Sequence, residues 1–174
     1  QSALLGQSCL EQGMVKATYG TGCFVLMHTG NEPVPSNHSL LTTPVCKVDT
    51  ASGYALEGSV FMGGAVIQWI RDGLGLIDNV SEIEKLAGQE ADSRGVYLVP
   101  GFVGLGAPHW DPHATGMIIG MSRSTNGAHI ARAALDCIAH QTADVLEAIR
   151  ADSGIHFSEV RVDGGAASNN LLMQ

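Results

Sequence analysis

VKATYGTGCFVLMH, residues 15–28, is the stretch on which the fold depends. β-Branched and other apolar residues lie on both sides of Gly20-Thr21-Gly22, a pattern typical of two strands joined by a tight turn. The segments LLTTPVCKV (40–48) and GYALEGSV (53–60) are predicted to be further strands. We therefore expect the first third of the chain to be a meander of short strands.

Helix and strand signals alternate after the meander. The clearest lies between residues 127 and 152, where apolar or small residues recur at steps of three and four and define one helix face. The chain is therefore predicted to have an α/β fold, in which a mixed sheet built from the strand meander is followed by helix/strand units. Helices are predicted at 61–74, 81–92 and 127–152, of which the second is acidic and expected on the surface. Strands are predicted at 95–102, which reads as a buried strand, at 116–121 and at 157–162. A helix end is expected within 1–12 and a helix beginning near 166.

Composition excludes several classes of protein. The chain has 174 residues, 45% of them hydrophobic, which is too apolar for a disordered protein. A net charge of -8 and only three lysines argue against a nucleic-acid binder. No apolar run is long enough to span a membrane. Charged residues are only 15% of the chain, so we expect another part of a larger protein to cover some of the surface.

Cysteine and histidine spacing does not favour a metal site. The four cysteines form no CxxC pair, and Cys23 and Cys137 lie in apolar segments, so reduced core thiols are expected. His109 and His113 flank a Trp-Asp-Pro turn, where proline prevents the helix that would bring them onto one face. No residue of this chain is therefore assigned to a metal.

Two glycine-centred junctions are candidate nucleotide contacts. At Gly20-Thr21-Gly22, bare backbone could approach a phosphate while the Thr21 hydroxyl donates to it, although this junction taken alone is better explained as a plain hairpin turn. Gly63-Gly64 opens a predicted helix that carries Gln68 one turn after Gly64. The Gln68 amide suits a ribose or a base edge. Close helix–sheet packing with a solvated Gln68 is the alternative.

A third junction, Asp163-Gly164-Gly165, repeats the spacing of the second. It is predicted to connect a strand to a helix, with Asn169 four residues after Gly165. Ligands of α/β proteins bind beyond the carboxyl ends of strands, where such turns lie. No P-loop motif is present, so the three junctions together predict nucleotide binding of another kind.

Longer motifs resemble a known family. The stretches YGTGCF (19–24), YALEGSVFMGGAVIQWIRD (54–72) and GLGAPHWDPHATG (104–116) resemble the glycerol kinases, of the sugar and polyol kinase superfamily with the actin-like ATPase (ribonuclease H-like) fold. The resemblance continues in order through GMIIGMSR, HIARAALD and RVDGGAASNN, over essentially the whole chain.

The resemblance implies that residues 1–174 are the C-terminal, nucleotide-side lobe of a two-lobed kinase, truncated at both ends. Such an enzyme transfers the γ-phosphoryl group of ATP, with Mg²⁺, to glycerol. The family's catalytic base is an Asp that would fall just before Gln1, so the catalytic residue is unknown here. Phe24 matches the residue that packs against glycerol. The implied nucleotide contacts are Thr21, Gly64, Gln68, Gly165 and Asn169.

Two other functions stay open at this point. One is a sister kinase of the same superfamily that phosphorylates another polyol or a ketose, since substrate choice lies mostly in the N-terminal lobe. The other is a non-catalytic actin-like domain that only holds nucleotide. The resemblance also implies that the parent is a homo-oligomer whose partners are ATP, glycerol and the N-terminal lobe. Reduced cysteines and the lack of a signal-peptide pattern predict a cytoplasmic protein, and composition predicts no nucleic-acid partner and no membrane span.

Overall fold

A mixed five-stranded sheet forms the centre of the computed structural model, which describes residues 1–46 and 53–174. Strands β1 (Val15–Tyr19) and β2 (Cys23–Gly30) pair antiparallel about the Gly20–Gly22 turn, as predicted, and β7 (Val160–Asp163) pairs with β1 in parallel. Residues 47 and 48 of the predicted third strand lie outside the described residues. The strand order is β3 (Leu41–Pro44), β4 (Tyr54–Val60), β2 (Cys23–Gly30), β1 (Val15–Tyr19) and β7 (Val160–Asp163).

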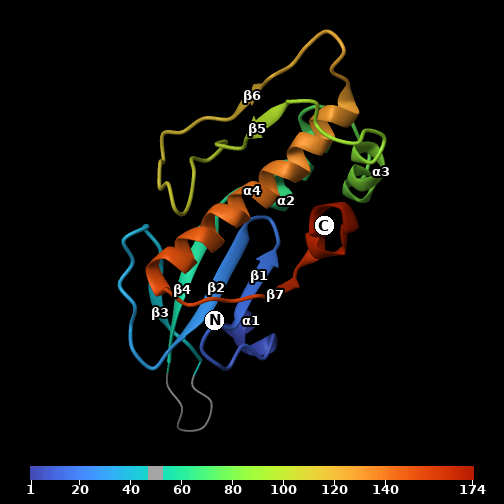
Figure 1. The fold of residues 1–174 in the computed structure, drawn as a ribbon. Helices are drawn as coiled ribbons and strands as arrows, with labels where there is room; N and C mark the ends of the chain where they lie inside the picture. Colours follow the sequence, from blue (N-terminus) through green and yellow to red (C-terminus); the bar gives the residue numbers. More distant parts are fainter. Residues whose placement is uncertain (47–52) are drawn as a thin grey trace.

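The long predicted helix is α4 (Gly127–Ser153), and it crosses one face of the sheet (Figure 1). It begins where the Asn126 side chain accepts hydrogen bonds from the backbone N–H groups of Ala128 and His129, and it ends at Gly154 in the left-handed conformation. Gly58 of β4 lets Val145 of α4 pack closely on the sheet, because a Cβ there would lie 2.3 Å from Val145.

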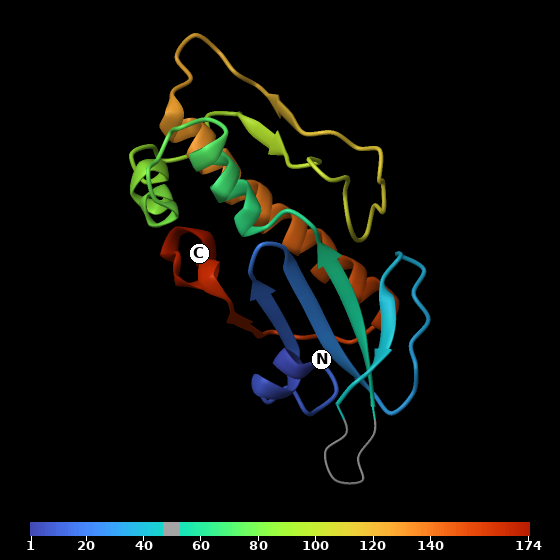
Figure 2. The ribbon, with the colours of Figure 1, turned by 180° about the vertical axis from the view of Figure 1, so that it is seen from behind.

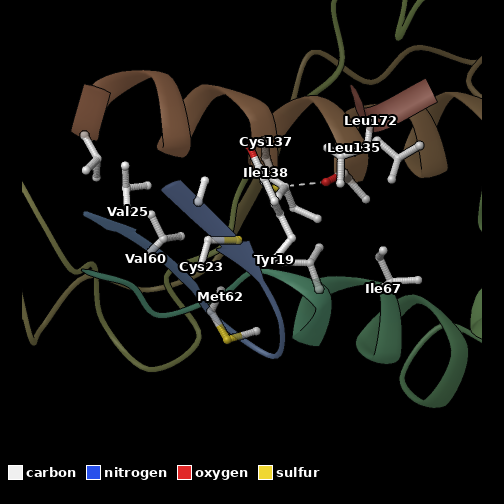
Figure 3. Close-up of a cluster of buried hydrophobic side chains, with 14 of the residues drawn as sticks. Tyr19, Cys23, Val25, Val60, Met62, Ile67, Leu135, Cys137, Ile138 and Leu172 are labelled. Atoms are coloured by element: carbon white, nitrogen blue, oxygen red, sulfur yellow. Dashed lines mark hydrogen bonds between the residues drawn. The ribbon is translucent and has the colours of Figure 1, made fainter. Parts of the chain in front are cut away.

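The main core lies between this sheet face, α4 and α2 (Gly64–Asp72). Alternate residues of β1 and β2 point toward apolar residues of α4, as the two-residue repeat of a strand requires (Figure 3). Cys23 and Cys137 are free, buried thiols, which confirms the prediction for them, and burial raises the pKa of each to about 12. A smaller core on the opposite face joins α1 (Ser2–Gly6) to the sheet.

Two sequence predictions differ from the structure. The predicted acidic helix at 81–92 is a 3₁₀ turn, η1 (Val80–Glu82), followed by a short α3 (Ile83–Ala87). Ile83 and Ala87 are buried against α4, so this segment is not wholly on the surface. The predicted buried strand at 95–102 is only β5 (Tyr97–Val99), which pairs with β6 (Met117–Ile119). In this two-stranded ladder Leu98 is buried, whereas Tyr97 is exposed because one face has no covering layer.

The C-terminal segment also differs from its prediction. A continuous helix was expected from residue 166, but a 3₁₀ turn, η2 (Gly165–Ser168), comes first and α5 (Asn170–Met173) follows. Within residues 1–46 and 53–174, no helix combines the length and apolar character needed to cross a bilayer.

A buried carboxylate fixes the end of α4 to the loop before β3. The side chain of Asp152 is fully buried and accepts hydrogen bonds from Ser36, from the backbone N–H of Asn37 at 2.9 Å and from His38 at 2.6 Å. Burial alone would raise the pKa of Asp152, but these hydrogen bonds hold it below its ordinary value. The ionised form is therefore the one that the fold stabilises.

Asp152→Asn is expected to lower the free energy of unfolding at pH 7 by about 2 kcal/mol, since charge-assisted hydrogen bonds are lost. The depressed pKa contributes stability above the unfolded value of about 3.9, and this is lost as pH falls through the folded pKa. Urea unfolding of both proteins should thus give curves that converge below about pH 4. Asp144→Asn, at a half-exposed carboxylate, is the control and should change stability by less than about 0.5 kcal/mol. A constant difference at every pH would contradict this role of Asp152.

Candidate nucleotide site

One cavity brings the three glycine junctions together. It has a volume of about 520 Å³ and lies among the β1–β2 turn, α2, the η1–α3 segment and η2. The hairpin turn, α3 and the C-terminal segment face this region in both ribbon views (Figures 1 and 2). All five residues expected to contact nucleotide line the cavity: Thr21, Gly64, Gln68, Gly165 and Asn169.

The first two junctions are joined by their backbones. The N–H of Gly64 donates to the carbonyl of Gly20 at 2.8 Å, and those of Gly63 and Ala65 donate to Thr21 at 2.9 and 3.0 Å. These carbonyl oxygens accept hydrogen bonds from the amides that begin α2, where no side chain caps the helix. The Gly63-Gly64 pair is thus explained by close packing of backbone on backbone, the alternative given for it above. Those three amides are not available to a ligand, although Gly64 still forms part of the cavity wall.

Gln68 lies one turn after Gly64 on α2, as its spacing predicts. Its side chain is exposed, lines the cavity and makes no hydrogen bond to the described part of the chain. The Thr21 side chain is exposed at the tip of the hairpin. Both polar groups are therefore free to bind a ligand.

The third junction packs directly on the first. Gly164 has φ of +93° and ψ of 166°, and a Cβ there would lie 2.4 Å from the carbonyl oxygen of Tyr19. Asn169 is 8% exposed and caps α5 by accepting from the N–H of Leu172 at 3.0 Å. The helix predicted to follow Gly165 therefore does not run on to Asn169, because the 3₁₀ turn η2 comes before α5. The side-chain NH₂ group of Asn169 nevertheless remains a possible donor at the cavity wall.

Sequence reasoning missed the wall opposite the hairpin. Val80 and Ser81 of η1 and Ile83 and Glu84 of α3 line the cavity, although this segment was expected to be a plain surface helix. The sequence does contain a signal for where it begins. Asn79 and Glu82 form a capping box, a pattern readable as Asn-x-x-Glu.

Phe24 lies outside this cavity. It is on β2, on the sheet face opposite α4, and its side chain is 45% exposed. Its neighbours across the strands are Thr18 and Ser59, both polar. A glycerol contact at Phe24 stays a prediction, since an exposed ring at this place is compatible with a substrate but does not test one.

The cavity does not form a cage for a metal ion. Among the residues that the structure describes, no group of three or more His, Cys, Asp or Glu side chains could hold one, and Glu84 is the one carboxylate in the cavity lining. Mg²⁺ in phosphoryl-transfer sites commonly binds phosphate oxygens, water and one or two carboxylates. The donors here fit a Mg²⁺ that enters with a nucleotide and do not fit a resident metal.

These groups suit a nucleotide better than a smaller anion. Ile67, Val80 and Ile83 give the cavity apolar walls against which a base could pack, while Thr21, Gln68, Ser81 and Asn169 supply polar groups. A sequence model for the FGGY family of carbohydrate kinases, C-terminal domain, matches residues 15–174. The chain belongs to this family.

Relatives of this FGGY domain are glycerol kinases. The chain is 60% identical over 173 residues to glycerol kinase of Paraburkholderia phytofirmans and 58% identical over 174 residues to that of Deinococcus radiodurans. These alignments cover 99% and 100% of this chain but 35% of each relative. The chain thus spans about a third of the length of the relatives that it matches.

Solved structures confirm the sugar-kinase, actin-like ATPase fold. The crystal structure of Plasmodium falciparum glycerol kinase with ADP matches with a TM-score of 0.92 and 39% identity, over 99% of this FGGY chain and 35% of that chain. Xylulose kinase of Bifidobacterium adolescentis matches with a TM-score of 0.80 and 24% identity, over 98% of this chain and 32% of that one. The second likeness concerns the fold alone.

Proposed function

We propose that residues 1–174 are the nucleotide-side lobe of a two-lobed glycerol kinase. The enzyme would transfer the γ-phosphoryl group of ATP to a terminal hydroxyl of glycerol, giving glycerol 3-phosphate and ADP. The observation that supports this best is the single cavity lined by all five expected nucleotide contacts. Glycerol kinases at about 60% identity support glycerol as the acceptor.

Nucleotide binding would depend on neutral groups, because the chain is acidic and its described cavity lining contains no Lys or Arg. We assign the phosphate end to Thr21 at the hairpin tip and the adenosine end to Gln68, Gly165 and Asn169. Mg²⁺ bound to the ATP phosphates would neutralise charge that the protein leaves unbalanced.

Phosphoryl transfer would form a bond from the glycerol oxygen to the γ-phosphorus and break the bond from that phosphorus to ADP. The hydroxyl proton would pass to the Asp expected just before Gln1, while Thr21 donates to a phosphoryl oxygen. Phe24 would pack against the carbon chain of glycerol. Closure of the N-terminal lobe over the bound ATP and glycerol would exclude water and limit ATP hydrolysis.

A sister kinase for another polyol or a ketose is the second candidate. The likeness to xylulose kinase structures favours it only at the level of the fold. A phosphorylation assay of the full-length protein with glycerol, a pentulose and other polyols separates the two. We expect kcat/KM to be highest for glycerol, and a preference for a pentulose would overturn this assignment. ATP binding without transfer to any of these acceptors would instead indicate a non-catalytic nucleotide-binding domain.

Gln68→Ala is expected to raise the KM for ATP about 10-fold in the full-length protein, which corresponds to one lost hydrogen bond to the nucleotide. Its Tm should not change, because the exposed side chain has no hydrogen-bond partner in the described chain. Gln89→Ala, whose site is exposed and outside the cavity lining, is the matched control. Equal KM values for Gln68→Ala and wild type would remove Gln68 from the site.

We also propose the cytoplasm as the location, since ATP is available there and the four cysteines are free thiols. Assembly of the parent into a homo-oligomer stays a prediction. Gel filtration with light scattering on the full-length protein tests it.

A further inference from the structure

A buried lysine lies on the sheet face opposite α4. Lys16 of β1 is only 2% exposed, and its Nζ donates to the Thr18 hydroxyl oxygen at 2.8 Å and to the Phe24 carbonyl at 3.0 Å. Burial lowers the pKa of Lys16, and the nearby carboxylates Asp163 and Glu57 oppose this effect. A buried cation is retained only where such partners compensate for its lost hydration.

Thr18 is hydrogen-bonded to this lysine and lies opposite a carboxylate on the neighbouring strand. Thr18 is paired in register with Asp163 on β7. Because Thr18 Oγ1 accepts from Lys16, its own hydrogen is free to donate to the Asp163 carboxylate. Burial alone would raise the pKa of Asp163, but hydrogen bonds from Thr18 and Gln7 and the charge of Lys16 lower it. Gln7 donates to Asp163 Oδ2 at 2.9 Å, which attaches the segment after α1 to the same carboxylate.

The Lys16–Thr18–Asp163 cluster lies beside both proposed ligand sites, the nucleotide cavity and the glycerol contact. Asp163 directly precedes Gly164, whose backbone packs on Tyr19 next to the hairpin turn. At the other end, Lys16 holds the backbone of Phe24, the proposed glycerol contact. Displacement of β7 against the hairpin would therefore move the Gly165 wall of the cavity relative to Thr21.

We propose that Thr18 is a positioning residue of the phosphoryl-transfer site, and that its hydroxyl, through Lys16 and Asp163, fixes β7 and β2 on either side of β1. This inference rests on the proposed function. The hydroxyl acts through its neighbours and does not touch substrate. Its loss should therefore reduce turnover, because displacements of about 1 Å at a reacting centre lower rates by about 100-fold.

Two substitutions at Thr18 separate the hydroxyl from the shape of the side chain. Thr18→Val keeps the shape and removes the hydroxyl, whereas Thr18→Ser keeps the hydroxyl and removes a methyl group. In the full-length protein we expect Thr18→Val to lower kcat about 10- to 100-fold with little change in the KM for ATP or glycerol. Thr18→Ser should retain kcat within about threefold, even if its Tm falls.

Thr29→Val is the matched control. Thr29 is a buried residue of the same hairpin, and its hydroxyl has no hydrogen-bond partner in the described part of the chain. We expect it to leave kcat unchanged. If Thr18→Val keeps wild-type kcat while Thr18→Ser loses it, the side chain serves packing and the inference is wrong. If wild type phosphorylates no glycerol, the proposed function fails first, which the same assay reveals independently of the variants.

Discussion

Gly164→Ala is expected to destabilise the chain by about 3 kcal/mol or more. The backbone at this position has φ of +93° and ψ of 166°, a region that is essentially restricted to glycine. A Cβ would also lie 2.4–2.9 Å from three backbone atoms of Tyr19, none of which can move without disturbing β1. The parallel pairing of β1 with β7 should therefore weaken, and nucleotide binding should be lost with it.

Gly165→Ala provides the control one residue away. A Cβ at Gly165 meets nothing within 4 Å and its φ is not positive, so stability should change by less than about 0.5 kcal/mol. Because Gly165 lines the cavity, the added methyl group should still weaken ADP binding. Urea unfolding and ADP titration on both variants measure the two effects separately. Similar stabilities for the two proteins would show that Gly164 does not have the conformation described.

Gly64→Val is expected to weaken nucleotide binding about 5- to 150-fold, the range that corresponds to overpacking by about 1–3 kcal/mol. A Cβ at Gly64 would lie 2.8 Å from the carbonyl oxygen of Gly20, so the hairpin turn must shift. The two methyl groups would also reduce the room between the turn and Gln68. Stability should fall as well, because the hydrogen bond from Gly64 to Gly20 is strained by the same shift.

Calorimetric titration with ADP well below the Tm of the variant distinguishes lost binding from lost folding. Gly6→Val is the control, since Gly6 is exposed and a Cβ there meets nothing within 4 Å. It should bind ADP as the wild type does. If folded Gly64→Val also binds ADP with wild-type affinity, the glycine pair serves only helix–hairpin packing and the cavity is not the nucleotide site.

The hairpin and α4 could be predicted because local signals agree with the tertiary structure. Strand-forming residues flank Gly20 and Gly22, and the apolar face of residues 127–152 is the face that packs on the sheet. The five residues expected to contact nucleotide line one cavity, and nucleotide binding by them stays a prediction. For Gly64, Gln68, Gly165 and Asn169 the glycine-then-amide spacing and the family resemblance pointed to the same positions.

The remaining features depend on contacts between distant segments. No local sequence pattern shows that Gly164 packs on Tyr19. Nor does one show that hairpin carbonyls accept hydrogen bonds from the amides of Gly63 and Gly64. The residues of η1 and α3 become a cavity wall only because α4 holds them opposite the hairpin. The helix predicted from residue 166 is interrupted because a 3₁₀ turn comes first, and the two kinds of helix begin with similar sequences.

The most direct test of nucleotide binding in this cavity is an amide NMR titration of the ¹⁵N-labelled 174-residue chain with ADP. Binding in the absence of the other lobe is expected to be weak, and NMR detects such binding residue by residue. We predict saturable shifts at the backbone amides of Thr21 and Gly165 and at the side-chain amides of Gln68 and Asn169. No shifts at millimolar ADP, or shifts confined to the α4–β5 side of the molecule, would contradict the assignment.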